Sequence, residues 1–282
     1  MATGPGEVVE GAAPTAPLAG GSRRARRRRA RRRTILGFVG IVGFFAIWQL
    51  LYELGTLDPL FFGSPTGVFK AYERLLIDGE LWPDLEVSAK EFVYGFVIGS
   101  LLGILTGVLV GWMSWLDDLT EPILAAFYAT PYVAFLPLII IWIGIGLWSR
   151  TVIVIWATFF PMLINTVAGV KNTPPEYLRV ADAFVVGRLR VLGKVVLPSS
   201  VPYMLAGLRQ SIGRALVAVI VAEFYLANDG IGFFITQATN AYRPDDAFAA
   251  ILLTSVAGIA LVRGVAVFER RIGRKWGLTQ TA

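Results

Sequence analysis

The stretch EFVYGFVIGSLLGILTGVLVGW, residues 91–112, decides the fold class of this 282-residue chain. After Glu91 it contains no charged residue. An α-helix rises ~1.5 Å per residue, so a run of this length can cross the hydrocarbon layer of a bilayer, which is ~30 Å thick. The stretch therefore predicts a transmembrane helix.

Glycines recur at intervals of four residues within this stretch. They are Gly95, Gly99, Gly103, Gly107 and Gly111. Glycine lowers helix stability, so five glycines on one helix face need a structural reason. Helices in lipid associate through close packing, which small residues permit. We predict a helix-packing ridge, and the sequence leaves open whether the facing helix belongs to the same chain or to a partner subunit.

Apolar blocks of similar length recur along the chain. Hydrophobic residues make up 55% of the sequence and charged residues 16%, whereas a soluble domain carries about 25% charged residues. We expect an all-α integral membrane protein with six transmembrane helices, at residues 35–54, 91–112, 119–143, 150–170, 203–226 and 247–268. The polar stretch 55–90 sets the first helix apart, which predicts one peripheral N-terminal helix and a five-helix core.

Basic residues predict the orientation of these helices. Nine arginines lie within residues 23–33, and 18 of the 26 Lys and Arg residues lie in this cluster, in the loop 171–201 or in the C-terminal tail. Cytoplasmic segments of membrane proteins carry such an excess, so we expect both termini to be cytoplasmic. Residues 1–34 then form a disordered, Arg-rich cytoplasmic tail, and residues 271–282 form a second cytoplasmic tail.

The arginine cluster has two interpretations. Clustered arginines can bind nucleic acid or anionic lipid. Here the apolar run of the first helix begins at Ile35, directly after the cluster. We therefore interpret the cluster as a topological anchor at the lipid bilayer and expect no nucleic-acid partner.

The sequence contains no cysteine and no histidine. This composition excludes disulfides, thiolate zinc sites and every triad that depends on histidine. A phosphate-binding loop of the Gly-x-x-x-x-Gly-Lys-Ser/Thr type is also missing, because the nearest passage, 187–195, has the wrong spacing and ends in valine. We expect no catalytic residue, no metal site and no cofactor, and thus a protein that is not an enzyme.

Ionisable residues interrupt the fifth predicted helix at Arg209, Arg214 and Glu223. These residues leave Ala215–Ala222 as the only clean apolar stretch, which is too short to cross a bilayer in contact with lipid. The segment must be shielded by other helices or face an aqueous cavity. We take these three residues, together with Asn165, as candidates for lining a translocation pathway; Glu223 can also be interpreted as an interfacial residue near the outer surface.

Prolines interrupt two of the predicted helices. Pro131 and Pro137 lie in the third, and Pro161 lies in the fourth. A proline leaves a backbone carbonyl without its donor, which a membrane tolerates only where protein or water satisfies it. Broken helices often line translocation paths. Ordinary kinks would give the same pattern, and the sequence leaves both interpretations open.

The loop 171–201 is framed by Pro174 and Pro175 at its start and by Pro198 near its end. Residues 176–186 between them have helix-forming content, and apolar residues recur on one face at Tyr177, Val180, Ala181 and Phe184. Pro-Pro-Glu fits a helix start with an acidic residue in the first turn. Such a short amphipathic helix suits docking onto another protein or lying on the lipid surface.

The stretch PEYLRVADAFVVGRLRVLGKVVLP, residues 175–198, resembles the cytoplasmic coupling loop of binding-protein-dependent ABC importer permeases. Their consensus is Glu-Ala-Ala, three residues, Gly, nine residues, Ile, any residue, Leu-Pro. Four positions of this chain match it: Ala181, Val195 in place of isoleucine, Leu197 and Pro198. Val180 replaces the first alanine. Arg179 stands where the glutamate is expected and Val185 where the glycine is expected.

Three flanking stretches look like the sulfonate, taurine and nitrate branch of that family. They are TPYVAFLPLIIIWIGIG at 130–146, FFPMLINTVAGV at 159–170 and AEFYLANDGIGF at 222–233. The resemblance covers about residues 85–270. It implies a type I importer core over 85–270, with the coupling loop at 171–201, in the inner membrane of a bacterial cell.

The resemblance also implies partners. Two permease subunits, here expected as a homodimer, form the pathway, a separate cytoplasmic ATPase binds each coupling helix, and an external solute-binding protein delivers the solute. The motif glutamate is missing, so Glu176 or Asp182 is expected to take its place. The implied solute is a small organic sulfonate, nitrate or a similar anion. The alternative is a self-contained secondary transporter, which would usually show internal repeats and paired intramembrane acids; neither is visible.

Overall fold

The fold is described here from a computed structural model of the chain, which describes residues 23–226 and 228–275. The chain divides into two compact units, Met1–Leu51 and Tyr52–Ala282. All described secondary structure is helical. Within the described residues, five helices are long and apolar enough to cross a membrane, and a bent pair of helices adds a sixth if the pair counts as one span. The predicted all-helical membrane fold is confirmed.

The first unit is built on helix α1, Arg23–Glu53. The part that could cross a membrane is Arg31–Glu53. The prediction that residues 23–34 belong to a disordered tail is wrong, because the helix begins at Arg23. Arginine is a good helix former, so the helix continues backwards through the arginine-rich segment. Residues 1–22 of the predicted tail lie outside the described residues.

The second unit begins with a segment that the sequence marked only as polar. Helix α2, Pro65–Tyr72, follows the N-cap residue Ser64, whose hydroxyl accepts a hydrogen bond from the Gly67 amide at 2.9 Å. The Ser64 amide donates to Asp245 Oδ1 of the last helix at 2.8 Å. A π-helical turn, Glu73–Ile77, completes the segment. Part of the stretch 55–90 is therefore packed against the helical core.

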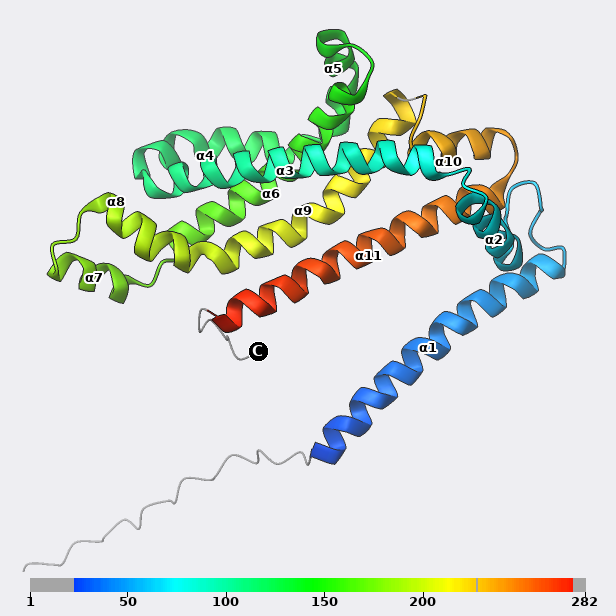
Figure 1. The fold of residues 1–282 in the computed structure, drawn as a ribbon, viewed down its shortest axis with the longest axis horizontal. Coiled ribbons are helices and arrows are strands. Elements are labelled where there is room, and N and C mark those ends of the chain that lie inside the picture. Colours follow the sequence, from blue (N-terminus) through cyan, green and yellow to red (C-terminus); the bar gives the residue numbers. More distant parts are fainter. Residues whose placement is uncertain (1–22, 227, 276–282) are drawn as a thin grey trace, which may run out of the picture. The chain divides into compact units, whose positions relative to one another are not determined.

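Helix α3, Trp82–Trp112, lies along α6, Leu147–Lys171 (Figure 1). All five glycines of the predicted ridge face α6. A methyl group added at Gly103 would lie 2.6 Å from the Cβ of Met162 and 2.7 Å from the carbonyl oxygen of Phe159. Both distances are shorter than van der Waals contact. The structure thus places the partner of the ridge within the same chain.

The third predicted helix is two helices in the structure. Helix α4, Ser114–Ala129, and helix α5, Leu136–Ile143, are separated by a 3-10 turn, Tyr132–Phe135, and bent by 85°. Thr130 and Pro131 have extended backbone, which ends α4. Of the two interpretations that the prolines of 119–143 left open, the structure shows a broken helix and not an ordinary kink, because the residue before a proline disfavours helical backbone.

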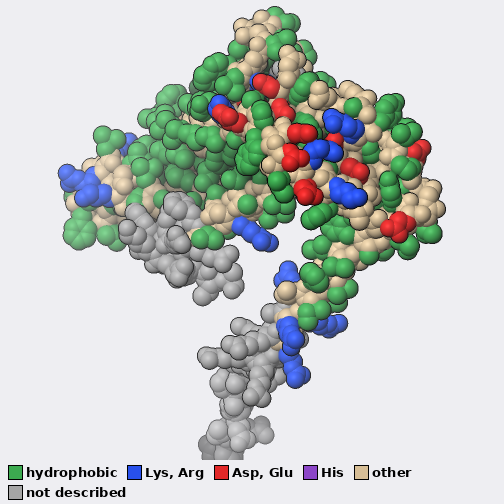
Figure 2. All heavy atoms as spheres, turned by 45° about the vertical axis from the view of Figure 1, so that its right-hand side comes forward, with side chains coloured by type: hydrophobic (Ala, Val, Ile, Leu, Met, Phe, Trp, Pro, Cys, Tyr) green, Lys and Arg blue, Asp and Glu red, His purple; other side chains and the backbone are tan. Residues whose placement is uncertain are grey.

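The core of the second unit lies where α3, α5, α6 and α9 meet. Helix α9, Leu197–Leu226, contributes three small residues, Ala215, Ala218 and Ala222, to this core. Small side chains let α6 and α9 approach closely. Helices α10, Ile231–Asn240, and α11, Pro244–Lys275, follow α9 and pack on it. Figure 2 shows hydrophobic side chains over much of the visible face, with Asp and Glu gathered mainly in one region.

Candidate functional site

The segment between α6 and α9 forms a compact helical element. Helix α7, Pro175–Ala183, begins with proline in its first turn and carries Glu176 there, as the sequence predicted. Proline suits this position because the first amides of a helix have no intrahelical acceptor. Helix α8, Arg188–Val191, and a π-helical turn, Leu192–Val196, lead into α9. Thr173 ties the segment down: its hydroxyl bonds the Val170 carbonyl at 2.9 Å and lies 3.1 Å from the Ser199 hydroxyl.

Helix α7 ends three residues earlier than predicted, in a Schellman turn. The Val186 amide donates to the Ala181 carbonyl at 3.0 Å, and the Val185 amide donates to the Asp182 carbonyl at 3.0 Å. This pattern of hydrogen bonds requires a residue with left-handed backbone conformation just after the end of the helix. That residue is Val185, with φ of 52°. Valine therefore occupies a backbone conformation that glycine usually supplies, at the position where the consensus has glycine.

The inner face of this element packs within the chain. Ala181 is 6% exposed and forms a buried cluster with Val170, Val191 and Val196. Val108 and Trp112 of α3 and Val195 pack against the same cluster. The cluster fixes α7 and α8 to the ends of α3 and α6. Ala181 therefore packs against its own chain, and its predicted part in ATPase coupling stays a prediction.

The outer face of the element is apolar and exposed. We call it the apolar patch, and its residues are Tyr177, Val180, Phe184, Val185 and Leu189. Phe184 is 78% exposed, Val185 89% and Leu189 82%. Basic side chains border the patch at Arg179, Arg188 and Arg190, all exposed. Beside it lies a groove of about 670 Å³ that Tyr177, Phe184, Arg190, Lys194, Val195 and Pro198 help to line.

The remaining predicted coupling residues take different places. Glu176 and Arg179 form an exposed ion pair of 3.7 Å one turn apart on α7. Such a pair contributes little to stability, so both side chains remain available to a partner. Asp182 is exposed, whereas Leu197 and Pro198 are half-buried at the start of α9. The element thus offers acidic, basic and apolar groups on one outward surface.

Two predicted pathway residues, Asn165 and Arg214, each donate a hydrogen bond to another helix. Asn165 of α6 donates a hydrogen bond to Gln210 Oε1 at 3.0 Å. Arg214 donates to the Tyr128 hydroxyl at 2.6 Å, and its guanidinium lies 4.8 Å from the centre of the Tyr128 ring. Arg209 is exposed on the same helix. The two hydrogen bonds join α9 to α6 and to α4, and the pathway role of these residues stays a prediction.

Glu223 has a different position from the one that the sequence suggested. Its side chain is fully buried, Oε1 accepts from the Ser88 hydroxyl at 2.5 Å, and Oε2 accepts from the Gly232 amide at 2.7 Å. Ser88 also accepts from the Ile231 amide at 2.9 Å. The structure shows a packing role for Glu223: it fastens the start of α10 to α3, because its oxygens accept where the first helical amides have no intrahelical partner.

A buried ionic group beside Glu223 was missed by the sequence analysis. Arg150 lies 3.0 Å from Glu91 Oε1 and 2.8 Å from Asp229 Oδ1. Asp84 accepts from the Gly230 amide at 2.7 Å. The signal that could have found this group is a Glu and an Arg at the starts of the second and fourth predicted helices. No cluster that could hold a metal ion occurs within residues 23–226 and 228–275.

The chain is similar in sequence to a known protein family and to several of its members. Residues 99–274 match the family described as binding-protein-dependent transport system inner membrane component. The putative aliphatic sulfonates transport permease protein SsuC of Escherichia coli is 34% identical over 77% of this chain and 82% of its own length. The riboflavin transport system permease protein RibX of Chloroflexus aurantiacus is also 34% identical, over 80% of this chain and 85% of its own length.

Solved structures show the same fold. A structure of the MetNI methionine ABC transporter in an inward-facing conformation superposes with a TM-score of 0.55 at 18% identity, covering 71% of this chain and 97% of that chain. A structure of an amino acid ABC transporter gives a TM-score of 0.59 at 15% identity. The family match covers more than half of the sequence. The chain belongs to the family of inner membrane components of binding-protein-dependent transport systems, the permease subunits of ABC importers.

Proposed function

We propose that this permease subunit forms the pathway for a small organic anion and couples it to a separate ATPase through the apolar patch. The printed sequence has no phosphate-binding loop of its own. In this proposal two copies of the chain form the pathway, both termini are cytoplasmic, and an external solute-binding protein delivers the solute. Membership in a binding-protein-dependent family supports the last of these partners.

The apolar patch is the observation that carries the ATPase assignment. It exposes Phe184 and Val185 outside the helices that are long and apolar enough to cross a membrane, and Leu189 at the start of one of them. Exposed apolar groups in one contiguous patch mark interaction surfaces, because their burial against a partner is favourable. A short amphipathic helix that lays such a face into a hydrophobic groove is a recurrent mode of recognition.

Two arginines on α9 and the names of two relatives support an anionic solute. Arg209 and Arg214 place two cations along α9, and cations beside a pathway favour an anionic solute. SsuC is named for aliphatic sulfonates, and the taurine permease TauC of Escherichia coli is 28% identical over 80% of this chain. RibX is named for riboflavin, so relatives of this similarity differ in solute. A titration of the solute-binding protein encoded beside this permease against sulfonates, nitrate and riboflavin tests the solute class.

The ATPase assignment is tested by a matched pair of variants. Phe184→Asp places a charge at the centre of the apolar patch, whereas Phe69→Asp changes an equally exposed phenylalanine (74%) on α2. Both variants are coexpressed with the ATPase from the same genome, and the complex is captured through the permease. We expect Phe184→Asp to accumulate in the membrane without the ATPase and Phe69→Asp to retain it. Equal retention by both variants would contradict the proposed coupling surface.

A further inference from the structure

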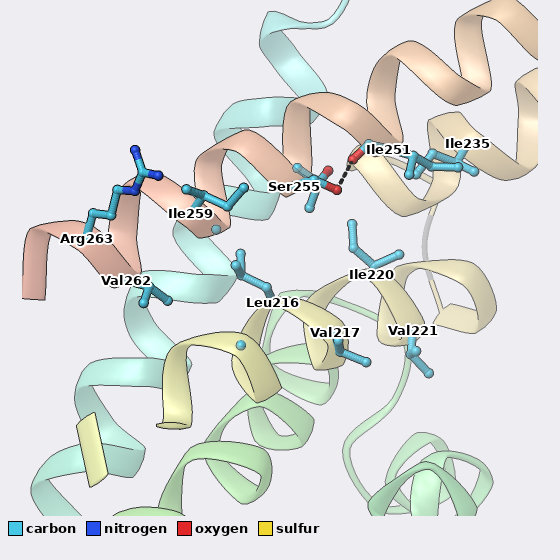
Figure 3. A pocket seen from close by; sticks show the side chains of 13 residues that line it. Leu216, Val217, Ile220, Val221, Ile235, Ile251, Ser255, Ile259, Val262 and Arg263 are labelled. Carbon is cyan, nitrogen blue, oxygen red and sulfur yellow. Dashed lines mark hydrogen bonds between the residues drawn. The ribbon is translucent and has the colours of Figure 1, made fainter. Parts of the chain in front are cut away.

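An apolar groove runs along the second unit between α9 and α11 (Figure 3). Its volume is about 560 Å³, and Leu216 and Ile220 of α9 face Ile251, Ser255 and Ile259 of α11 across it, while Val217 also lines it. Val217 is 56% exposed and Ile259 54%. The groove therefore opens to the outside of the described helices.

The polar atoms of the groove are satisfied by their own helix. The Thr254 hydroxyl donates to the Ala250 carbonyl at 2.9 Å, and the Ser255 hydroxyl donates to the Ile251 carbonyl at 2.9 Å. A cavity without free polar groups holds water poorly and accepts apolar ligands instead. The groove therefore favours a hydrocarbon occupant.

A cation lies at one end of the groove. Arg263 of α11 is exposed and forms no hydrogen bond or ion pair with another described residue. It lies 19 residues after Pro244, the first residue of α11, or ~28 Å along the helix. Since the hydrocarbon layer is ~30 Å thick, Arg263 reaches the depth of the lipid headgroups on one side. Long basic side chains at this depth extend towards the headgroups.

We propose that this groove binds one acyl chain of an anionic phospholipid, with Arg263 bound to the headgroup phosphate. From Arg263 to Ile251 the groove extends ~18 Å, close to the ~15 Å depth of one leaflet. A phosphate at Arg263 and an acyl chain along Ile259, Ser255 and Ile251 match the groove in charge, polarity and length. This inference concerns the lipid surface of the subunit and does not depend on the proposed solute.

A flexible acyl chain fits the floor of the groove better than a helix does. The two walls already meet at Leu216 and Gly258, where a methyl group on the glycine would lie 2.8 Å from Leu216 Cδ1. Helices pack with their axes 8–10 Å apart through interlocking side chains. The contact between Leu216 and Gly258 leaves no gap into which the side chains of a third helix could insert. The methylene groups of an acyl chain can instead lie along the surface.

Two glycines provide a matched test. Space within 4 Å of an added side-chain carbon is empty at Gly213, which lines the groove, and at Gly264, which does not. The full chain is reconstituted with equal amounts of phosphatidylglycerol and phosphatidylcholine, and the lipids that remain bound are identified by native mass spectrometry. We expect the unmodified chain and Gly264→Phe to retain phosphatidylglycerol about fivefold over phosphatidylcholine, the ratio expected for one basic residue near the headgroups.

Gly213→Phe fills the groove and should lose the retained lipid. Arg263→Gln, an exposed change, should retain lipid without preference for phosphatidylglycerol. Unchanged retention in Gly213→Phe, or unchanged preference in Arg263→Gln, would overturn the proposal.

The chain has no cysteine, so Val217→Cys introduces a single thiol. An oxidised dimer of Val217→Cys in the membrane would show a second copy in the groove, and that result would also overturn the proposal.

Discussion

A guanidinium nitrogen of Arg150 lies 3.0 Å from the carboxylate of Glu91, and the two side chains are 6% and 0% exposed. Arg150 belongs to the first turn of α6 and Glu91 to α3, the helix that carries the glycine ridge. The same guanidinium contacts Asp229 in the connection between α9 and α10. One cation thus joins three segments that are far apart in the sequence.

Removing this cation should destabilise the fold strongly. Arg150→Met leaves the carboxylate of Glu91 buried without its partner, and such a loss costs about 3–5 kcal/mol. We expect a large fall in the thermal unfolding midpoint of the purified protein. Lys90→Met is the control, because Lys90 pairs with Glu86 in the exposed pair next to Glu91 and should change the midpoint little.

The double variant Glu91→Leu with Arg150→Met separates a missing charge partner from a general packing defect. Replacing both members of a buried pair by apolar groups is often nearly neutral. The double variant should therefore unfold at a higher temperature than Arg150→Met alone. A double variant no more stable than the single one would show that packing, and not charge, explains the loss.

The glycine ridge shows what the sequence could predict. Its four-residue spacing indicated a close helix contact, and the structure supplies the contact with α6. The all-helical membrane fold and the permease family were also predicted correctly, because long apolar runs and the loop motif are local signals. The identity of the facing helix was not accessible, since several apolar helices of similar length could have filled that place.

The ridge predicts a strong asymmetry between two neighbouring positions. Gly103→Leu would drive a side chain into Met162 and the backbone of α6, whereas Leu101 is 55% exposed and faces away from the ridge. Overpacking a tight contact costs about 1–3 kcal/mol or more. We expect Gly103→Leu to reduce the yield of monodisperse protein severely and Leu101→Ala to reduce it little. Size-exclusion chromatography of the two variants checks this, and equal yields would contradict the packing role.

The faces of α7 show where the sequence was insufficient. Val180 and Ala181 are neighbours in an apolar pattern, yet Val180 is 56% exposed and Ala181 is 6% exposed. A periodic pattern identifies an apolar stripe on a helix. It does not show which residues of the stripe pack against the chain's own helices and which are left to contact a partner. The cluster with Val170 and Val196 decides this, and it depends on contacts between distant segments.

The Schellman turn of α7 predicts a stabilising substitution. Val185 holds a left-handed backbone, which costs a residue with a Cβ about 1–2 kcal/mol, while glycine also gives the unfolded chain more freedom. Val185→Gly should raise the free energy needed to open this element by about 0.5–1 kcal/mol. Because a protease cleaves the opened form, cleavage should become about two- to fivefold slower. Trypsin cleavage at Arg188 and Arg190 in the isolated permease measures it.

Val186→Gly is the control for this turn. Val186 follows directly, packs against the buried cluster of Ala181 and has no left-handed backbone, so glycine there removes packing without relieving strain. Its trypsin cleavage should be faster than that of the unmodified chain. If both glycine variants were cleaved faster, the strain assigned to Val185 would be wrong.

Ala181→Glu and Phe184→Asp should both release the ATPase, but for different reasons. A glutamate at position 181 enters the cluster of Val170, Val191 and Val196, where its charge has no partner, and such burial costs several kcal/mol. The element should open before the ATPase is offered, so trypsin should cleave Ala181→Glu much faster in the isolated permease. Phe184 is 78% exposed, so Phe184→Asp should leave the cleavage rate unchanged.

The two measurements together distinguish the inner face from the outer one. If loss of the ATPase followed only from opening of the element, Phe184→Asp would retain it. If the outer face alone mattered, Ala181→Glu would be resistant to trypsin and still bind. The structure predicts loss of binding in both variants and increased cleavage in one, because Ala181 holds the element together while Phe184 is available to a partner. A trypsin-resistant Ala181→Glu would contradict the buried position of Ala181.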